Sequence, residues 1–364
     1  MTDIAFFLMD VGGGGAEKAM LTLAGGFAEQ GLKVDVVLVK TEGEYLSFIS
    51  PKVRLVKLEG QRLITSLPLL VNYLKREQPK VLISTLDDPN AIALWAKQFA
   101  RVSTRVVVTV QNHLSRSCQM SDQLKRRLTP LFARLFYPWA DEIVAASQGV
   151  AKDVACITGL PPEQIEVIYN PIFTSDLLEK FQQPVNHPWF LDKHLPVILG
   201  VGRLVKQKDF PTLIRAFALV QQQYSSRLMI LGQGEELPHL QRLVKELNLE
   251  ESVIFPGFIA NPYAYMAQAK VFVLSSAFEG FGNVLVEAML AGTPVVSTDC
   301  ESGPAEILEN GKYGKLVAVG DVPGLAEAII STLNNPVNPE LLRQKGREFS
   351  LETISSEYRK VFNL

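Results

Sequence analysis

Residues 4–30 read IAFFLMDVGGGGAEKAMLTLAGGFAEQ, an apolar run, a glycine-rich turn and an amphipathic stretch in that order. The run Ile4–Met9 has the length of a buried strand, and Ala16–Gln30 has the spacing of a helix. The same order returns where Val197–Gly200 leads through Gly202-Arg203-Leu204 into a helix that begins near Phe210. Two starts of one architecture predict two similar domains.

Short β-branched and aromatic runs alternate with helical patterns along most of the chain. We expect strands at Ile4–Met9, Val34–Val39, Val53–Leu58, Val81–Thr85, Val106–Val110, Ile143–Ala145, Glu166–Tyr169, Val197–Gly200, Arg227–Leu231, Val253–Phe255, Val271–Leu274, Pro294–Thr298 and Leu316–Val317. Several of these runs are apolar throughout, as strands of a parallel sheet covered on both faces are. This alternation predicts the α/β class with two doubly wound, Rossmann-like sheets.

The length of 364 residues fits two domains at about 150 residues each. The weakly periodic, proline-containing stretch Pro171–Pro196 marks the expected boundary. We therefore predict an N-terminal domain at residues 1–172 and a C-terminal domain at residues 173–364. The last amphipathic segment, residues 351–364, can pack on either domain, including back on the N-terminal one.

Composition excludes several classes of protein. Hydrophobic residues make up 47% and charged residues 20%, which argues against a disordered chain. The net charge of −2 gives no reason to expect nucleic acid as a partner. Three scattered cysteines indicate neither a disulfide framework nor a zinc site, so we expect a reducing cytoplasm. The N-terminal apolar run is too short for a signal peptide or a membrane span.

The stretch Phe278–Met289, FEGFGNVLVEAM, carries the strongest chemical signal. It follows the predicted strand Val271–Leu274, and its last glycine opens a helix whose amino end suits a phosphate. Glu279 lies before that helix, and Glu287 lies about one turn inside it, where it could accept hydrogen bonds from ribose hydroxyls. Alternatively, both are solvated acids favoured by the helix dipole.

This stretch resembles the nucleotide-binding signature of the family-4 retaining glycosyltransferases, in which two glutamates are separated by seven residues. Each further motif is weak alone, but together they cover nearly all of the second half in the expected order. They are Asn170-Pro171, Val201–Leu204 with Lys208-Asp209-Phe210, Leu231–Gly234, Phe255–Phe258, Ala291–Asp299 and Ser302-Gly303-Pro304, with Gly14-Gly15-Ala16-Glu17 near the start of the chain.

The resemblance implies the GT-B fold, in which two Rossmann-like domains face a central cleft and the C-terminal one holds most of the donor. Arg203 and Lys208 match the basic pair that grips the donor diphosphate. Glu287 matches the ribose ligand, and Glu279 matches the acid beside the donor sugar. The remaining donor contacts implied in this way are Gly14, Gly15, Gly202, Gly280, Phe281, Gly282, Asn283 and Val284.

The same resemblance implies a metal-independent reaction that needs no cofactor. Cations at the diphosphate can stabilise the leaving group, and no acidic DxD-like cluster stands out to hold a metal; Asp87-Asp88 is the nearest candidate. In the first half, the turn Gly12–Gly15 has the position of a phosphate-cradling loop but lacks the GxGxxG pattern. A tight turn built of small residues is the alternative.

A histidine often faces the donor sugar in this family, just after the strand represented here by Val106–Val110. Aligning the strand places Gln111 at that position, with His113 two residues later. Either Gln111 replaces the histidine, or His113 supplies the group as a catalytic residue. Glu301 and Ala305 also depart from a common form of the family's motif.

The acceptor side is marked by a helical stripe. Its apolar members are Leu124, Leu128, Leu131, Phe132, Leu135, Phe136 and Trp139, and Lys125, Arg126, Arg127 and Arg134 lie largely off it. One interpretation is a helix that packs this stripe into the first domain. The other is a surface that rests on an anionic membrane, at the inner face of the cytoplasmic membrane, and meets a lipid-linked acceptor.

These observations predict transfer of a hexose or N-acetylhexosamine from a nucleotide-diphosphate sugar, with UDP the commonest donor nucleotide in the family. The acceptor would be a hydroxyl of a glycan or of a lipid-linked molecule in polysaccharide or glycolipid synthesis. Two alternatives are a nucleotide-sugar isomerase of the same fold and a non-catalytic nucleotide-sugar-binding protein. The combination of Arg203, Lys208, Glu279 and Glu287 favours the transferase.

Overall fold

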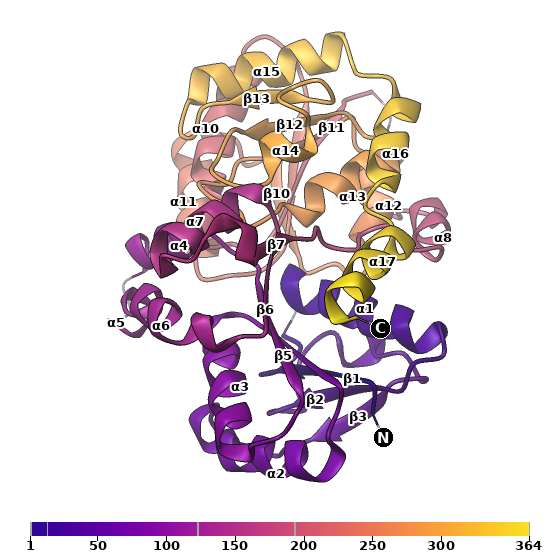
Figure 1. Cartoon of the computed structure of the whole chain (residues 1–364). Coiled ribbons are helices and arrows are strands. Elements are labelled where there is room, and N and C mark those ends of the chain that lie inside the picture. The colour runs from indigo at the N-terminus through magenta and orange to yellow at the C-terminus, as the bar shows by residue number, and fades with distance from the viewer. Residues whose placement is uncertain (1, 13, 122–123, 193, 364) are drawn as a thin grey trace. The chain divides into compact units, whose positions relative to one another are not determined.

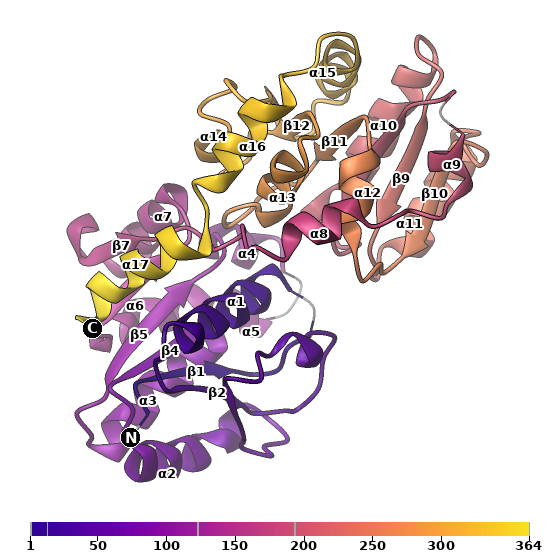
Figure 2. The ribbon, with the colours of Figure 1, turned by 90° about the vertical axis from the view of Figure 1, so that its right-hand side faces the viewer.

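The computed structural model describes residues 2–12, 14–121, 124–192 and 194–363 (Figures 1 and 2). The side chains of Leu124 and Lys125 also lie outside the described part. The chain forms two compact units. The N-terminal unit runs up to Pro171 and also includes the segment from Leu351 onward, and the C-terminal unit spans Ile172–Ser350.

The N-terminal unit is built on a parallel sheet. Its strands are β1 (Ile4–Leu8), β2 (Val34–Leu38), β3 (Arg54–Lys57), β4 (Val81–Thr85), β5 (Arg105–Val110), β6 (Glu142–Ala145) and β7 (Ile165–Val167). Its helices are α1 (Gly15–Glu29), α2 (Leu67–Glu77), α3 (Asp87–Ala100), α4 (Leu114–Gln119), α5 (Leu124–Arg127), α6 (Thr129–Phe136), α7 (Gln148–Thr158) and α17 (Leu351–Phe362). Short 3-10 turns lie at η1 (Leu46–Phe48), η2 (Ile64–Ser66), η3 (Tyr137–Trp139) and η4 (Pro162–Gln164). Over the described residues the strand order is β3-β2-β1-β4-β5-β6-β7.

The C-terminal unit repeats this plan. Its strands are β8 (Val197–Val201), β9 (Arg227–Leu231), β10 (Val253–Gly257), β11 (Val271–Leu274), β12 (Val295–Thr298) and β13 (Lys315–Val317). Its helices are α8 (Leu177–Gln182), α9 (Pro188–Leu191), α10 (Phe210–Gln221), α11 (Leu237–Glu246), α12 (Pro262–Gln268), α13 (Asn283–Ala291), α14 (Pro304–Ile307), α15 (Val322–Asn334) and α16 (Pro339–Arg347), with the 3-10 turn η5 (Lys206–Lys208). In the part of the chain that the structure describes, the order is β10-β9-β8-β11-β12-β13, and all the pairs are parallel.

Successive side chains of a strand point to opposite faces of the sheet, and helices cover the apolar side chains on both faces. In β1, Phe7 belongs to the core on the α2–α3 face, and Phe6 and Leu8 belong to the core on the α1–α17 face. An apolar run that is buried on both sides reads as continuous hydrophobic sequence. The predicted doubly wound α/β class is confirmed, since each predicted strand overlaps an observed one.

The last helix joins the N-terminal core. In α17, Tyr358 and Phe362 are buried among the residues of the α1 face, and the Phe362 ring lies 5.8 Å from that of Phe27. The Gln30 side chain donates a hydrogen bond to the Ser355 hydroxyl at 3.0 Å. The N-terminal unit is therefore built from two segments of the chain, the first and the last. None of the described helices is long and apolar enough to cross a membrane.

Strand order reverses direction at one place in each sheet, between β1 and β4 and between β8 and β11. In open parallel sheets the loops that follow the two strands at such a point separate, and ligands bind at the carboxyl ends of the strands there. The loops that carry the predicted donor contacts, after β8 and β11 and after β1, all leave these strands. The loops with the predicted donor contacts therefore lie at the sheet edges where this topology binds ligands.

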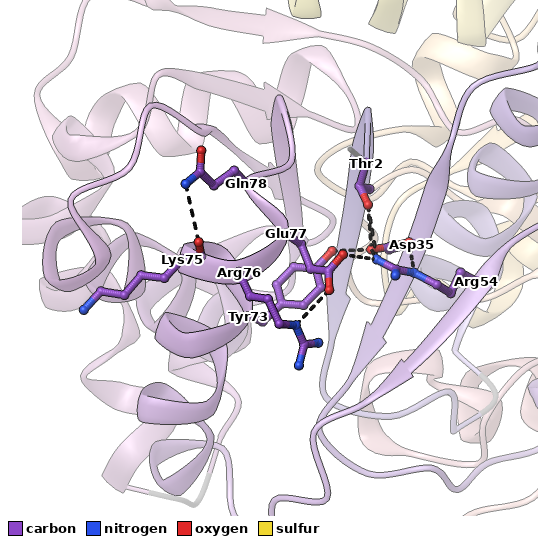
Figure 3. A network of polar contacts seen from close by, with 8 residues as sticks. All are labelled: Thr2, Asp35, Arg54, Tyr73, Lys75, Arg76, Glu77 and Gln78. Carbon is purple, nitrogen blue, oxygen red and sulfur yellow. Dashed lines mark hydrogen bonds and ion pairs between the residues drawn. The ribbon is translucent and has the colours of Figure 1, made fainter.

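A buried carboxylate ties the outer strands of the N-terminal sheet to α2 (Figure 3). Asp35 accepts two hydrogen bonds from the Arg54 guanidinium, at 2.8 Å from Nε and 2.5 Å from Nη2. It also accepts from the Tyr73 hydroxyl at 2.6 Å and from the Thr2 hydroxyl at 3.1 Å. Burial and the neighbouring Asp35 raise the pKa of Tyr73, so its hydroxyl stays a donor. Arg54 also pairs with Glu77, at 2.7 Å.

Replacing Asp35 by asparagine should destabilise the protein, because it removes charge-assisted hydrogen bonds from a buried group. We expect Asp35→Asn to lower the free energy of unfolding by about 1.5–3 kcal/mol, measured by urea unfolding. As the control, Arg76→Ala removes an exposed pair with Glu77 and should change it by less than about 0.5 kcal/mol. Equal effects of the two substitutions would show that the network does not stabilise the fold.

Candidate functional site

Two loops meet where the strand order of the C-terminal sheet reverses. The loop after β8 contains η5, and the loop after β11 leads into α13. Main-chain and side-chain hydrogen bonds hold them together: Ala277 N–H donates to the Gln207 carbonyl at 2.8 Å, the Gln207 side chain donates to the Phe278 carbonyl at 3.0 Å, and the Ser275 hydroxyl donates to the Lys208 carbonyl at 2.8 Å. The two loops therefore form one rigid edge.

A buried ion pair crosses this edge. The Lys208 Nζ lies 2.6 Å from Oε1 of Glu279, and the two side chains are 15% and 8% exposed. The Ser276 hydroxyl donates to the same Oε1 at 2.6 Å, and the Thr298 hydroxyl in turn holds the Ser276 carbonyl at 2.6 Å. Both of these contacts fall on Oε1, so Oε2 is the oxygen of Glu279 that a ligand could engage.

The amino end of α13 lies directly after this pair. Gly282 caps the helix with φ at 103°, a left-handed value that favours glycine. Gly280 and Phe281 precede the cap, and Asn283 and Val284 begin the helix. A helix start of this kind aims main-chain N–H groups and a positive dipole end at a bound anion.

Glu287 lies one turn inside α13. It is buried, and its Oε1 accepts a hydrogen bond from the Tyr263 hydroxyl of α12 at 3.2 Å. Tyr263 packs edge-on against Phe181 of α8, which fixes the ring. The glutamate is therefore positioned by neighbouring helices, as a residue that has to meet a ribose in one geometry would be.

Arg203 differs from Lys208 because its side chain is exposed, and no described residue pairs with its guanidinium. Its backbone is nevertheless fixed, since Leu204 N–H donates to the Gln233 carbonyl at 2.8 Å and Gly202 N–H donates to the Leu231 carbonyl at 3.0 Å. Gly232 has φ at 137°, and a Cβ there would lie 1.9 Å from the Gly202 carbonyl oxygen. Only glycine allows this approach of the two turns.

The N-terminal sheet offers the turn before α1. Gly14 caps α1 in an extended conformation, and Gly15 is the first helical residue. Gly13 lies outside the described residues. The Asp10 carboxylate accepts from Gly12 N–H at 3.0 Å, and the Glu17 side chain lies beside Gly14. The turn is thus strand-to-helix, as the sequence predicts, with an acidic side chain next to its amino end.

Gln111 and His113 have separate surroundings. Gln111 directly follows β5, and its Oε1 accepts from the Asn170 side chain at 2.9 Å. His113 precedes α4, and its Nδ1 lies 3.2 Å from Oδ2 of the buried Asp153 and 3.5 Å from Arg116 N. Arg116 N–H donates to Nδ1 in the longer contact, whereas a hydrogen bond to Asp153 needs a proton on Nδ1, so only one of the two hydrogen bonds forms at a time. Asp153 lies beside the ring in either case. Asp153 also accepts two hydrogen bonds from Ser115.

Asp87 begins α3 at the carboxyl end of β4. Burial and the neighbouring Asp88 raise the pKa of the Asp87 carboxyl to about 7. The preceding residue, Leu86, has φ at 71°, a strained value for a residue with a branched side chain. Within the described residues no group of three or more His, Cys, Asp or Glu side chains has a metal-binding arrangement, and metal independence stays a prediction.

Lys208, Glu279 and the start of α13 lie together in the C-terminal unit. Arg203 lies in the same loop as Lys208, and Glu287 lies in α13. Gly14, Gly15, Gln111 and His113 belong to the other unit. Sequence reasoning missed Ser276, Tyr263 and Asp153, which contact Glu279, Glu287 and His113. Only Ser276 had a sequence signal, as a hydroxyl three residues before Glu279; the other two lie 24 and 40 residues from their partners.

Known proteins resemble the chain over its whole length. Residues 185–349 match the family described as Glycosyl transferases group 1, and residues 13–176 match Glycosyltransferase Family 4. The chain is 32% identical over 346 residues to the N-acetylgalactosamine-N,N'-diacetylbacillosaminyl-diphospho-undecaprenol 4-alpha-N-acetylgalactosaminyltransferase of Campylobacter jejuni subsp. jejuni serotype O:2, covering 92% of this chain and 91% of that protein. It is 29% identical over 358 residues to the lipopolysaccharide core biosynthesis glycosyltransferase LpsE of Rhizobium meliloti, covering 96% and 95%.

Two solved structures share the fold. The Anabaena protein Alr3699/HepE in complex with UDP-glucose has a TM-score of 0.81 at 23% identity, covering 100% of both chains. The sucrose-phosphate synthase of Thermosynechococcus elongatus has a TM-score of 0.80 at 22% identity, covering 100% of this chain and 98% of that one.

The raised pKa of Asp87 predicts how stability depends on pH. An ordinary aspartate titrates near 3.9 when unfolded, so between about pH 4 and pH 7 the folded state binds the proton more tightly. Stability should therefore fall as pH rises through this window. Asp87→Asn removes the effect, and its melting temperature should exceed that of the wild type above pH 7 and converge with it near pH 4.

A matched substitution sharpens this measurement. Asp88→Asn removes a neighbouring charge that, together with burial, raises the pKa of Asp87. The pH range over which stability falls should therefore be lower in this variant than in the wild type. Identical pH profiles for the wild type and Asp87→Asn would show that Asp87 has an ordinary pKa in the folded protein.

Proposed function

The chain belongs to the glycosyltransferases of group 1 and family 4, and we propose that it moves a hexosyl or N-acetylhexosaminyl group from a UDP-sugar to a hydroxyl of a glycan or lipid-linked acceptor. Its two Rossmann-like units are those of the GT-B fold. The proposed reaction retains the anomeric configuration and needs neither a metal nor a cofactor.

The pairing of Lys208 with Glu279 at the edge where β8 and β11 end carries this proposal. A diphosphate at this edge would meet the Lys208 ammonium, the Arg203 guanidinium and the N–H groups at the start of α13. A guanidinium binds phosphate oxygens bidentately, and lysine acts as a point charge. These groups favour the negative charge that grows on the leaving diphosphate.

The remaining donor contacts follow from the same edge. Glu287, held by Tyr263, would accept hydrogen bonds from the ribose hydroxyls. Glu279 would use Oε2 to orient hydroxyls of the donor sugar, since Oε1 is already engaged. Gly14 and Gly15 would approach the donor from the N-terminal unit, and His113, which lies beside Asp153, or Gln111 would contact the donor sugar.

The chemistry balances with the acceptor and donor alone. The bond from the anomeric carbon to the diphosphate oxygen breaks, and a bond from that carbon to the acceptor oxygen forms on the same face. The acceptor hydroxyl gives its proton to the leaving phosphate oxygen. Glu279 therefore acts on the sugar without forming a covalent bond to it.

Several comparisons support the substrate classes. The Anabaena structure is a complex with UDP-glucose, which favours a uridine donor. The Campylobacter relative is named for a diphospho-undecaprenol acceptor, and the Rhizobium relative for lipopolysaccharide core biosynthesis. An acceptor of this kind would place the protein at the inner face of the cytoplasmic membrane. An isomerase of the same fold would convert the donor without any acceptor, so product analysis with donor alone separates the two activities.

Removing either cation should slow the chemical step more than it weakens donor binding. We expect Arg203→Ala and Lys208→Ala each to lower kcat by about 10²–10³, with a smaller rise in the KM for the donor. Lys206→Ala is the matched control, because Lys206 is an exposed lysine of the same turn. Unchanged turnover in both variants would remove the pair from the mechanism.

A double-mutant cycle separates the two roles of Lys208. Lys208→Ala also leaves Glu279 buried without its partner, so part of its effect should vanish in the Glu279→Gln background. Additive effects of the two substitutions on kcat would mean that the ion pair is not maintained during the reaction.

The stereochemistry and the metal requirement can be measured directly. The product should keep the anomeric configuration of the donor, read from its NMR coupling constant. Activity should survive EDTA, because cationic side chains supply the charge that a metal would otherwise provide. Inversion would exclude the retaining mechanism, and loss of activity with EDTA that Mg²⁺ or Mn²⁺ restores would exclude metal independence.

A further inference from the structure

An apolar row is exposed on α6 and η3 of the N-terminal unit. Leu131 and Leu135 are 53% and 54% exposed, and Leu128, Phe132 and Trp139 are similarly exposed. These five side chains, the α6 row, lie within twelve residues of sequence. The expectation that this stripe packs into the first domain is therefore wrong for them. A contiguous exposed apolar patch of this kind marks an interaction surface in a folded protein.

The opposite side of the same helix is fixed in the core. Ala133 and Tyr137 are each 2% exposed, and α6 packs against α3 and α7. The Phe136 ring meets Trp95 of α3 edge-on at 5.2 Å, and the Asn90 side chain donates to the Tyr137 hydroxyl at 3.3 Å. Because these contacts set the rotation of α6, the α6 row cannot turn inward without breaking them.

Cationic side chains border the row. Arg126 and Arg127 of α5 and Arg134 of α6 are exposed. The Arg127 Nε donates to the Ser121 carbonyl at 3.0 Å, an uncharged partner that leaves its positive charge in place. Leucine, phenylalanine and tryptophan beside arginine are the composition of a helix that lies in the headgroup region of an anionic bilayer.

The basic border also lies close to the edge of the N-terminal sheet. Burial and Asp88 raise the pKa of Asp87, and Arg126 is close enough for its charge to oppose that rise, so α5 is near the carboxyl end of β4, where a doubly wound sheet binds its ligand. A bilayer under the α6 row would therefore lie beside this edge. That placement fits an acceptor whose sugar is attached to a lipid.

We propose that the α6 row and its arginines bind the surface of an anionic lipid bilayer. The inference rests on the proposed function only for the acceptor's identity as a lipid-linked molecule. A second copy of the chain is the competing occupant, but three arginines around the row would then face each other across the interface, where like charges repel. Anionic headgroups complement them instead.

The test uses the full chain and vesicles. One set contains phosphatidylcholine alone, and the other contains equal parts of phosphatidylcholine and phosphatidylglycerol. The wild type should cosediment with the anionic vesicles, less so at high salt. Leu131→Gln with Leu135→Gln should weaken this binding roughly ten- to thirty-fold. Arg126→Gln with Arg127→Gln should weaken it roughly five-fold for each charge and reduce its dependence on salt.

Matched controls come from exposed residues of the same unit. Phe99, 63% exposed at the end of α3, is replaced as Phe99→Gln, and the charges of α2 are removed as Lys75→Gln with Arg76→Gln. Neither control should change vesicle binding. Equal binding by wild type and row variants, no binding by the wild type, or a dimer that the leucine substitutions dissociate would overturn the proposal.

Donor binding is measured on the same samples. A UDP-sugar should raise the melting temperature of the wild type and the row variants alike, because binding to the folded state stabilises it. A row variant that loses vesicle binding but keeps this rise in melting temperature would show that the row acts in membrane binding and not in donor binding. Absence of the shift in the wild type would instead count against the proposed donor, whatever the vesicles show.

Discussion

The ion pair between Lys208 and Glu279 is the interaction on which the candidate site depends. Seventy-one residues separate the partners, and they meet because β8 and β11 are neighbours in a parallel sheet and end at the same edge. Both side chains are largely buried, so either one alone would be a desolvated charge. The pair, with Ser276, therefore fixes the edge in one geometry before any ligand arrives. In the proposed function, a diphosphate would share the ammonium with Glu279, whereas Arg203 would meet it with an exposed guanidinium that pairs with no described residue.

The two units have the same strand order around their first strand and different chemistry at the corresponding edge. The C-terminal edge carries Lys208 and Arg203, and the N-terminal edge carries Asp87 and Asp153. Cations attract a diphosphate, whereas carboxylates repel it and accept hydrogen bonds from hydroxyls. In the proposed function, the cations of the C-terminal edge would therefore bind the donor diphosphate, and the carboxylates of the N-terminal edge would accept hydrogen bonds from hydroxyls, since function lies in the side chains at the edge.

Much of the fold could be predicted because buried parallel strands are apolar along their whole length. The predicted run Val34–Val39 and the observed strand Val34–Leu38 differ by a single residue, and the helix predicted to begin near Phe210 is α10, which begins at Phe210. Glu279 and Glu287 could be selected because the stretch that holds them resembles a family signature. Tyr263, the partner of Glu287, could not, because it lies 24 residues away and a hydroxyl that positions a distant carboxylate has no sequence pattern. The same limit holds for Asp153, which reaches His113 only after α7 packs beside α4.

Helical periodicity failed in a different way on α6. It correctly marks which side chains share a face, but an amphipathic helix can have two apolar faces, and the sequence does not say which one the core uses. Here the core takes Ala133 and the ring of Tyr137, on the side where α6 packs against α3 and α7. The fold therefore uses only the smaller apolar face of α6. Folding alone does not require large apolar side chains on the other face, which is why we assign that face to an interaction.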